Sequence, residues 1–133
     1  MIGIGVVSEA EIAAVIPAFY AKVRKDPMLG PIFNDAIGDW PEHLEKLQAF
    51  WSSVMLASGR YKGQPMPAHV RHAARITPAA FARWLELWDE TTRELLPAEA
   101  AAAMQDRAER IAESLALGIQ LYQAREAELA AAD

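Results

Sequence analysis

Apolar residues recur every three or four positions along most of the chain, the spacing that brings side chains to one face of an α-helix. The first such run carries Ile12, Val15, Ile16, Phe19, Tyr20 and Val23. It begins with Ser8 followed by Glu11, a capping-box pair in which each side chain satisfies a free backbone amide of the other residue. Because proline cannot donate a backbone hydrogen bond, Pro17 is expected to divide this run into a short first piece and a second helix over 17–25.

Three further helices are predicted from start signals that contain proline. Asp39 precedes Pro41, and Thr77 precedes Pro78, so that a capping side chain is followed in each case by a proline in the first turn. Pro97 opens the last and longest helix. The apolar faces of these helices are predicted to carry, in chain order, His43, Leu47, Phe50, Trp51 and Val54; then Phe81, Trp84, Leu85 and Trp88; then Met104, Ala108, Ile111, Leu115, Gly118 and Tyr122.

Two stretches interrupt the helical pattern. Residues 26–39, "DPMLGPIFNDAIGD", hold two prolines and two glycines and are expected to form short turns of helix at most. Residues 61–75, "YKGQPMPAHVRHAAR", place two of the three histidines directly after a segment broken by glycine and proline. No segment alternates with the period of two that a strand requires, so the chain is predicted to be all-α, with its long helices packed on one another.

Composition narrows the class of protein. The 133 residues predict one domain, 1–133, with a core over about 8–125 and a frayed C-terminal tail. The chain is 53% hydrophobic and 23% charged, which is typical of a globular protein. Cysteine is absent, which excludes disulfides, thiolate metal sites and covalent c-type haem. A net charge of −5 disfavours nucleic-acid binding. With no apolar run of membrane length and no basic leader in "MIGIGVVSEAEIAA", the cytoplasm is the expected location.

Three predicted helices bring a residue with a polar tip to an apolar face: Tyr20, His43 and Trp84. Such a tip needs a hydrogen-bond partner when it is buried. A helical Tyr or Trp is usually core filling whose tip reaches a carbonyl or water, and His43 near a helix start is equally compatible with exposure. Lys46, taken alone, would be a solvated charge. These residues are therefore candidates for a ligand site only in combination.

His69 and His72 stand three positions apart, which places them on neighbouring positions of one helix face. A zinc pair is one interpretation, but cysteine is absent and no carboxylate stands nearby at the spacing of zinc motifs. Haem iron needs only one proximal imidazole, and the apolar content and four tryptophans suit the walls of a large flat cofactor. Composition alone does not separate His69 from His72.

The chain resembles the group III truncated haemoglobins over about Ile12 to Tyr122. The resemblance is carried by the combination of "FYAKVRKDPMLGPIFNDAIG", "WPEHLEKLQAFW", "YKGQPMPAH" and "RWLELW". Members of that family fold as a two-on-two sandwich of helices around non-covalently bound haem b. The helix that bears their proximal histidine is shortened and follows a loop, as the segment 61–75 would. The resemblance therefore implies the truncated-globin fold.

The resemblance also implies roles for individual residues. The piece "GQPMPAH" ends on His69, which makes this residue the iron ligand and leaves His72 near the haem edge or solvent. The other ring nitrogen of His69 is then expected to donate to a carbonyl of the preceding loop. Three positions match the distal residues beside a bound ligand: Tyr20, His43 and Trp84. Four match positions that contact haem, Phe33 and Leu47 against the ring and Lys46 and Tyr61 toward a propionate.

The implied function is the binding of O2, with NO, CO or peroxide as further ligands. NO dioxygenase or peroxidase-like chemistry would need an external reductase, because the chain carries no reductase domain. The alternative from another class is a haem-free helical binding or scaffold module. In that alternative, His69 and His72 are surface residues and the aromatic stripe is plain core.

Overall fold

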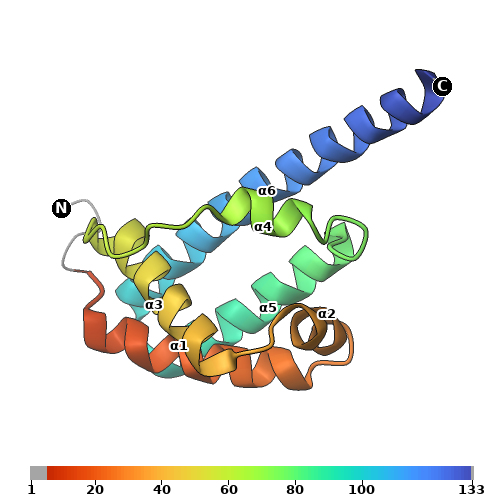
Figure 1. Ribbon diagram of the computed structural model, residues 1–133. Coiled ribbons are helices and arrows are strands. Elements are labelled where there is room, and N and C mark those ends of the chain that lie inside the picture. Colours follow the sequence, from red (N-terminus) through yellow and green to blue (C-terminus); the bar gives the residue numbers. More distant parts are fainter. Residues whose placement is uncertain (1–5, 133) are drawn as a thin grey trace.

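The computed structural model describes residues 6–132, and the elements formed within that range are helices (Figure 1). They are α1 (Glu9–Lys25), α2 (Leu29–Ala36), α3 (Trp40–Leu56), α4 (Pro65–Val70), α5 (Pro78–Leu95) and α6 (Ala98–Ala132). The prediction of an all-α protein is confirmed. Residues 1–5 and 133 lie outside the described part. The predicted domain, 1–133, and the N-terminal segment examined for a leader both include residues of this kind. No helix in that part is long and apolar enough to cross a membrane.

The helices pack as two pairs joined by one central contact. α1 packs on α3, α5 packs on α6, and α1 also packs on α5, which joins the pairs. The short helices complete this arrangement, with α2 against α1 and α4 across α6 (Figure 1). This is the two-on-two arrangement that the resemblance implied.

The predicted helix starts are confirmed by their caps. Ser8 Oγ accepts from the Glu11 backbone N–H at 3.1 Å, while the Glu11 carboxylate accepts from the Ser8 N–H at 2.8 Å. Asp39 caps α3 and Thr77 caps α5, each by accepting a backbone N–H three residues later. Each cap satisfies amides that have no partner inside the helix.

The predicted break at Pro17 is wrong, because α1 continues through this residue from Glu9 to Lys25. Pro17 is exposed, as is Ala13, whose carbonyl would have accepted the missing N–H. That carbonyl can therefore bond to water. The buried face on either side, which includes Ile16 and Phe19 at 0% exposure, outweighs the loss of one hydrogen bond.

The segment 26–39 is more helical than expected, since α2 extends over eight residues. Asp26 explains the difference, because its carboxylate accepts from the backbone N–H groups of Met28 at 3.0 Å and Leu29 at 2.9 Å. These bonds satisfy amides at the start of the helix. The sequence signal for this helix was Asp26, a capping residue directly before Pro27. The prediction overlooked it because it relied on the number of prolines and glycines in the segment.

The predicted face of the last helix is correct only for part of its length. Met104 and Ala108 are fully buried and Leu115 is buried, but Tyr122 is 41% exposed. The reason is visible in Figure 1, where the C-terminal part of α6 extends past the other helices. The apolar periodicity continues there without a helix to cover it.

Tryptophan and phenylalanine side chains fill the core between the two helix pairs. Phe19 and Trp88 are 0% exposed and Trp51 is 1% exposed. The stripe predicted for α5 is buried at Trp88, whereas Phe81 and Trp84 are half-buried. These two residues line a cavity, and Trp84 packs against the core with its other side.

Candidate functional site

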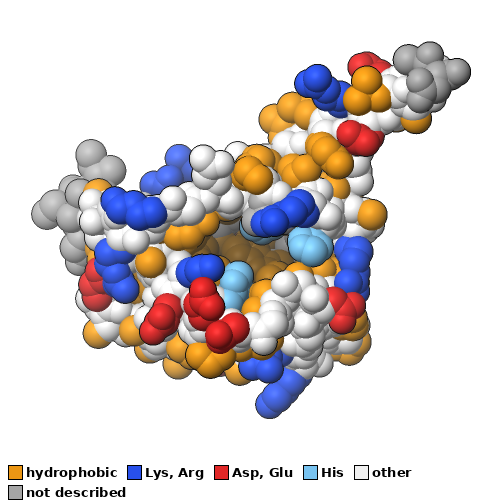
Figure 2. Space-filling model, viewed as in Figure 1, with side chains coloured by type: hydrophobic (Ala, Val, Ile, Leu, Met, Phe, Trp, Pro, Cys, Tyr) orange, Lys and Arg blue, Asp and Glu red, His pale blue; other side chains and the backbone are white. Residues whose placement is uncertain are grey.

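The helices enclose a cavity of about 540 Å³ that opens on the face shown in Figure 2. This volume lies in the range of about 300–1,000 Å³ that is common for ligand and cofactor pockets. Residues from α1, α2, α3, α5 and α6 and from the segment around α4 form the wall. All eight residues named from the sequence lie on it: Tyr20, Phe33, His43, Lys46, Leu47, Tyr61, His69 and Trp84.

His69 is the residue on this wall whose ring geometry suits a metal ligand. Its Nδ1 lies 2.7 Å from the backbone carbonyl oxygen of Pro65, at the start of the same short helix. A carbonyl oxygen can only accept, so the N–H of the neutral ring is on Nδ1. Nε2 is then left with a free lone pair, which is the form that binds a metal. The expected bond to a carbonyl is present, although that carbonyl belongs to α4 and not to the loop before it.

His72 also lines the cavity, but its side chain is exposed at the mouth. It follows α4, in a run of turns over 71–75. Its backbone N–H donates to the His69 carbonyl at 3.0 Å, whereas its ring has no recorded bond among the described residues. The two histidines that composition could not separate therefore differ in burial and in the hydrogen bonding of their rings.

Tyr20 comes to the opposite side of the cavity on α1, which lies across from α4 (Figure 1). It is 4% exposed, and burial raises the pKa of its hydroxyl well above the usual 10.0, while Trp84 acts in the lowering direction. The hydroxyl therefore stays protonated and available as a hydrogen-bond donor across the physiological pH range.

Trp84 is fixed by two further indoles. Its ring stacks on Trp88 with centroids 5.6 Å apart, and Trp88 stacks on Trp51 at 4.4 Å. Trp88 Nε1 donates to the carbonyl oxygen of Met104 at 3.1 Å, which sets the orientation of the middle ring. Phe19 packs edge-on against both Trp84 and Trp88. The Trp84 ring is therefore pre-positioned at the cavity wall by its neighbours in the core.

His43 lies on the first turn of α3 and is half-buried. Burial, together with the positive charge of Lys46, lowers the pKa of its imidazole below the usual 6.5. The ring is therefore neutral near pH 7 and has one N–H to donate and one lone pair to offer. Trp40 packs edge-on against it, with centroids 5.9 Å apart.

The mouth of the cavity carries charged and histidine side chains among hydrophobic ones (Figure 2). Lys46 is 64% exposed and pairs loosely with Glu42 at 3.4 Å, so its ammonium is free to move. Tyr61 is held by its backbone N–H, which donates to Ser53 Oγ at 2.9 Å, and by an edge-on contact with Phe50. The apolar residues Phe33 and Leu47 lie deeper and pack partly against the core.

Sequence reasoning missed several residues of this wall. Arg71, two residues after His69, lies at the cavity with its side chain exposed. From α6, the wall includes Ile111, Ala112 and Leu115. The two larger of these were visible in the apolar stripe of the last helix, but periodicity does not tell a cavity wall from a packed face.

The donor set fits haem better than a protein-only metal site. Among the described residues, no group of three or more His, Cys, Asp or Glu side chains is placed to hold a metal ion. A single imidazole with a free Nε2 is a sufficient protein ligand for haem iron, because the porphyrin supplies four further ligands. The largely apolar cavity behind it suits a flat aromatic cofactor.

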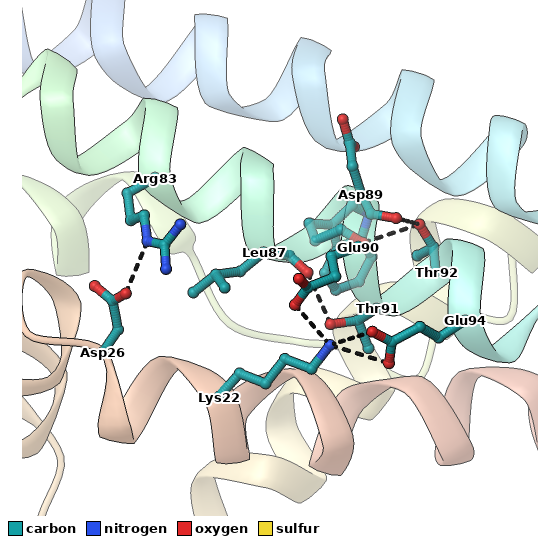
Figure 3. A network of polar contacts seen from close by, with 10 residues as sticks. Lys22, Asp26, Arg83, Leu87, Asp89, Glu90, Thr91, Thr92 and Glu94 are labelled. Carbon is teal, nitrogen blue, oxygen red and sulfur yellow. Dashed lines mark hydrogen bonds and ion pairs between the residues drawn. The ribbon is translucent and has the colours of Figure 1, made fainter.

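Polar contacts between helices hold the elements that form the wall (Figure 3). Arg83 Nε donates to the Asp26 carboxylate at 2.7 Å and so ties the cap of α2 to α5, the helix of Trp84. Burial alone would raise the pKa of Asp26, but the N–H groups of Leu29 and Met28 and the Arg83 guanidinium outweigh it, and the pKa lies below the usual 3.8.

Asp26→Ala is expected to lower the unfolding free energy by about 2 kcal/mol at pH 7, through loss of the α2 cap and of a largely buried ion-pair partner. Because the folded-state pKa is depressed, the carboxylate stabilises the fold above pH 3.8 and this contribution disappears as the pH falls through the folded-state pKa. Urea titrations from pH 7 to about pH 3 should show the gap to the parent narrowing.

Glu90→Ala provides the control for that series. Glu90 pairs with Lys22 at 2.9 Å at the surface, and the expected loss of stability is small because solvent screens an exposed ion pair. If the difference in unfolding free energy between Asp26→Ala and the parent stayed constant over the whole pH range, the ionised carboxylate of Asp26 would not be the source of the stabilisation.

The chain is 37% identical over 110 residues to the group 3 truncated haemoglobin ctb of Campylobacter jejuni, covering 80% of this chain and 86% of that protein. The fold matches the crystal structure of a group III truncated haemoglobin from Campylobacter jejuni with a TM-score of 0.77 and 35% identity, covering 85% of this chain and 91% of the other. No family model matches the sequence.

Proposed function

Because the chain belongs to the group III truncated haemoglobins, it is a globin that binds haem b non-covalently and takes gaseous ligands, and we propose that His69 is its iron ligand and Tyr20 its principal ligand-binding donor. The observation that carries the proposal is the 2.7 Å bond between His69 Nδ1 and the Pro65 carbonyl. This bond fixes the ring tautomer and leaves Nε2 with a free lone pair that could bind the iron.

The remaining wall residues would hold the cofactor by contacts that match its shape. Phe33 and Leu47 present apolar surface to the flat ring from α2 and α3. Lys46 and Tyr61, at the mouth, would meet its carboxylates, and Lys46 is exposed and mobile enough to do so. When bound, haem would supply an iron that can bind a diatomic ligand and shift electron density onto it.

Three side chains would act on a partly negative O2 molecule held on the distal side. Tyr20 donates its hydroxyl proton in a hydrogen bond, because burial keeps the group protonated. Trp84 offers its indole N–H from a ring that is already held in place by Trp88. His43, neutral at pH 7, can add a further donor or close the path to solvent. Fixed donors in a cavity shielded from water stabilise such a charge more strongly than water does.

Several donors around one ligand favour its retention, and retention favours chemistry on the ligand over transport. We therefore propose NO dioxygenation, with peroxide reduction as the second candidate, in each case with electrons from an external reductase. NO and CO are the expected further ligands, and the cytoplasm is the proposed location. Rapid-mixing assays of NO and of peroxide consumption, with a chemical reductant supplied, separate the two reactions. Turnover of neither would leave ligand binding as the function.

The first test of the site is an absorption titration of the protein with haem. We expect saturation at one haem per chain, a strong Soret band, and spectra of the ferric, ferrous and CO-bound forms that show histidine ligation. The haem-free scaffold module, the alternative from another functional class, predicts a colourless protein after haem has been supplied. A high-spin ferric spectrum would assign water to the sixth position, whereas a low-spin spectrum lost in His43→Ala would assign His43.

A further inference from the structure

The helix that carries His69 is too short to fix its own position. α4 extends over six residues, and its N-cap residue, Gln64, makes no side-chain capping bond. An isolated helix of this length is not stable in water. Its main packing partner is α6, which it crosses in Figure 1. The placement of His69 therefore depends on how α4 is seated on α6.

The seat is a contact between Met66 of α4 and Gly118 of α6. A Cβ atom added to Gly118 would collide with Met66 Sδ and lie 2.6 Å from Met66 Cε. Real Cβ atoms do not approach neighbours this closely, so any side chain at this position would displace the methionine. The missing side chain of Gly118 forms a notch that the Met66 thioether fills.

Backbone conformation gives no other reason for glycine here. Gly118 lies well inside α6, and its φ is outside the left-handed region that favours glycine. A glycine inside a helix is intrinsically less favourable than alanine. The space for Met66 is therefore the feature of the structure that accounts for it.

The notch is linked to the metal-binding ring through one residue. Met66 follows Pro65, whose carbonyl oxygen accepts from His69 Nδ1 at 2.7 Å. Sδ and Cε are the flexible end of the Met66 side chain, so a change at the notch reaches this acceptor only where α4 moves together with the methionine. Further along α6, Gln123 Nε2 donates to the carbonyl oxygen of Ala73 at 3.3 Å and holds the far end of the same segment.

We propose that Gly118 is a positioning residue, whose notch seats Met66 and thereby sets the height and orientation of His69 at the cavity. The inference rests on the proposed role of His69 as iron ligand. Gly118 itself does not line the cavity. It acts through α4, and replacing it should alter the bond between iron and imidazole rather than the distal side.

The test is Gly118→Ala in the haem-loaded protein, read out by the Fe–His stretching band in resonance Raman spectra of the ferrous form and by the rate of haem transfer to an apoglobin acceptor. We expect the band to shift and haem loss to accelerate about tenfold, as on losing support behind a metal ligand. In the double variant with Met66→Ala, the collision is removed. Its Fe–His band and haem-transfer rate should therefore equal those of Met66→Ala alone. Ser114→Ala, at an exposed position one turn earlier, is the control for helix propensity and should match the parent.

The possible outcomes are distinguishable. A parental band and haem-loss rate in Gly118→Ala overturn the inference, as does a double variant that shows no restoration. A Gly118→Ala protein that does not fold, while the double variant folds and binds haem, supports the notch. His69→Ala is measured alongside. If this variant retains the Fe–His band, His69 is not the iron ligand. If it loses the band while Gly118→Ala behaves like the parent, His69 is the ligand and only the positioning role of Gly118 is refuted.

Discussion

Replacing His69 with alanine is expected to abolish the bond between protein and iron and to weaken haem binding more than any other single change. The other two histidines of the wall are not held in this way, since His72 is exposed at the mouth and His43, on α3, packs edge-on against Trp40. Loss of a group behind a metal ligand costs about 10- to 100-fold in affinity, so loss of the ligand itself should exceed about 100-fold. Haem titrations followed at the Soret band measure the change directly.

His72→Ala is the matched control, because it removes an imidazole three residues away that lines the same cavity. We expect its haem affinity and ferrous spectrum to resemble those of the parent. Exogenous imidazole should restore a histidine-like spectrum in His69→Ala, since the space vacated by the ring is then open to it. A His72→Ala protein that lost the iron ligand while His69→Ala retained it would reverse the assignment.

The fold was largely predictable because the start of a helix is determined by residues close together in the sequence. Ser8, Asp39 and Thr77 each cap the helix that they precede, and a cap depends on residues three positions apart. The predicted break at Pro17 was wrong because the rule that proline ends a helix considers only the local backbone. Whether the helix continues was decided by the burial of its apolar face. The cost of one missing hydrogen bond is fixed by the sequence, whereas the compensating burial of Ile16 and Phe19 depends on helices far along the chain.

The site was only partly predictable from the residues. Tyr20, His43 and Trp84 could be recognised as polar tips on apolar faces, and the structure brings all three to one cavity. That convergence depends on which helices pack together, which periodicity does not reveal. The resemblance to a family supplied the missing information, and the roles inferred from it remain predictions until they are measured.

The choice between the two histidines shows where sequence reasoning ends. His69 and His72 share a helix face by spacing, and nothing in their neighbours' composition separates them. The deciding contact is the carbonyl of Pro65, which is placed by the first turn of α4. The notch at Gly118 is equally hidden, since a glycine in a helix predicts only reduced stability until the opposite side chain is known.

Tyr20→Phe is expected to speed O2 dissociation by about 10- to 150-fold. The change removes one hydroxyl and keeps the ring, which packs against Phe33 and Phe19, so the cavity should retain its shape. A hydrogen bond to a partly charged acceptor contributes about 1.5–3 kcal/mol, which corresponds to this factor. Because burial keeps the hydroxyl protonated, the parent rate should not vary with any titration of Tyr20 between pH 6 and about 9.

Stopped-flow displacement of O2 by CO gives the off-rate of each variant, with Tyr61→Phe as the control for loss of a tyrosine hydroxyl at the cavity mouth. Trp84→Phe should also raise the rate. The double variant should show less than the product of the two factors, because the hydroxyl and the indole N–H would share one acceptor. If the off-rate of Tyr20→Phe equals that of the parent while Trp84→Phe is fast, the indole is the principal donor. If both single variants match the parent, neither residue stabilises the ligand, and retention of O2 would have to arise from His43 or from the closed cavity itself.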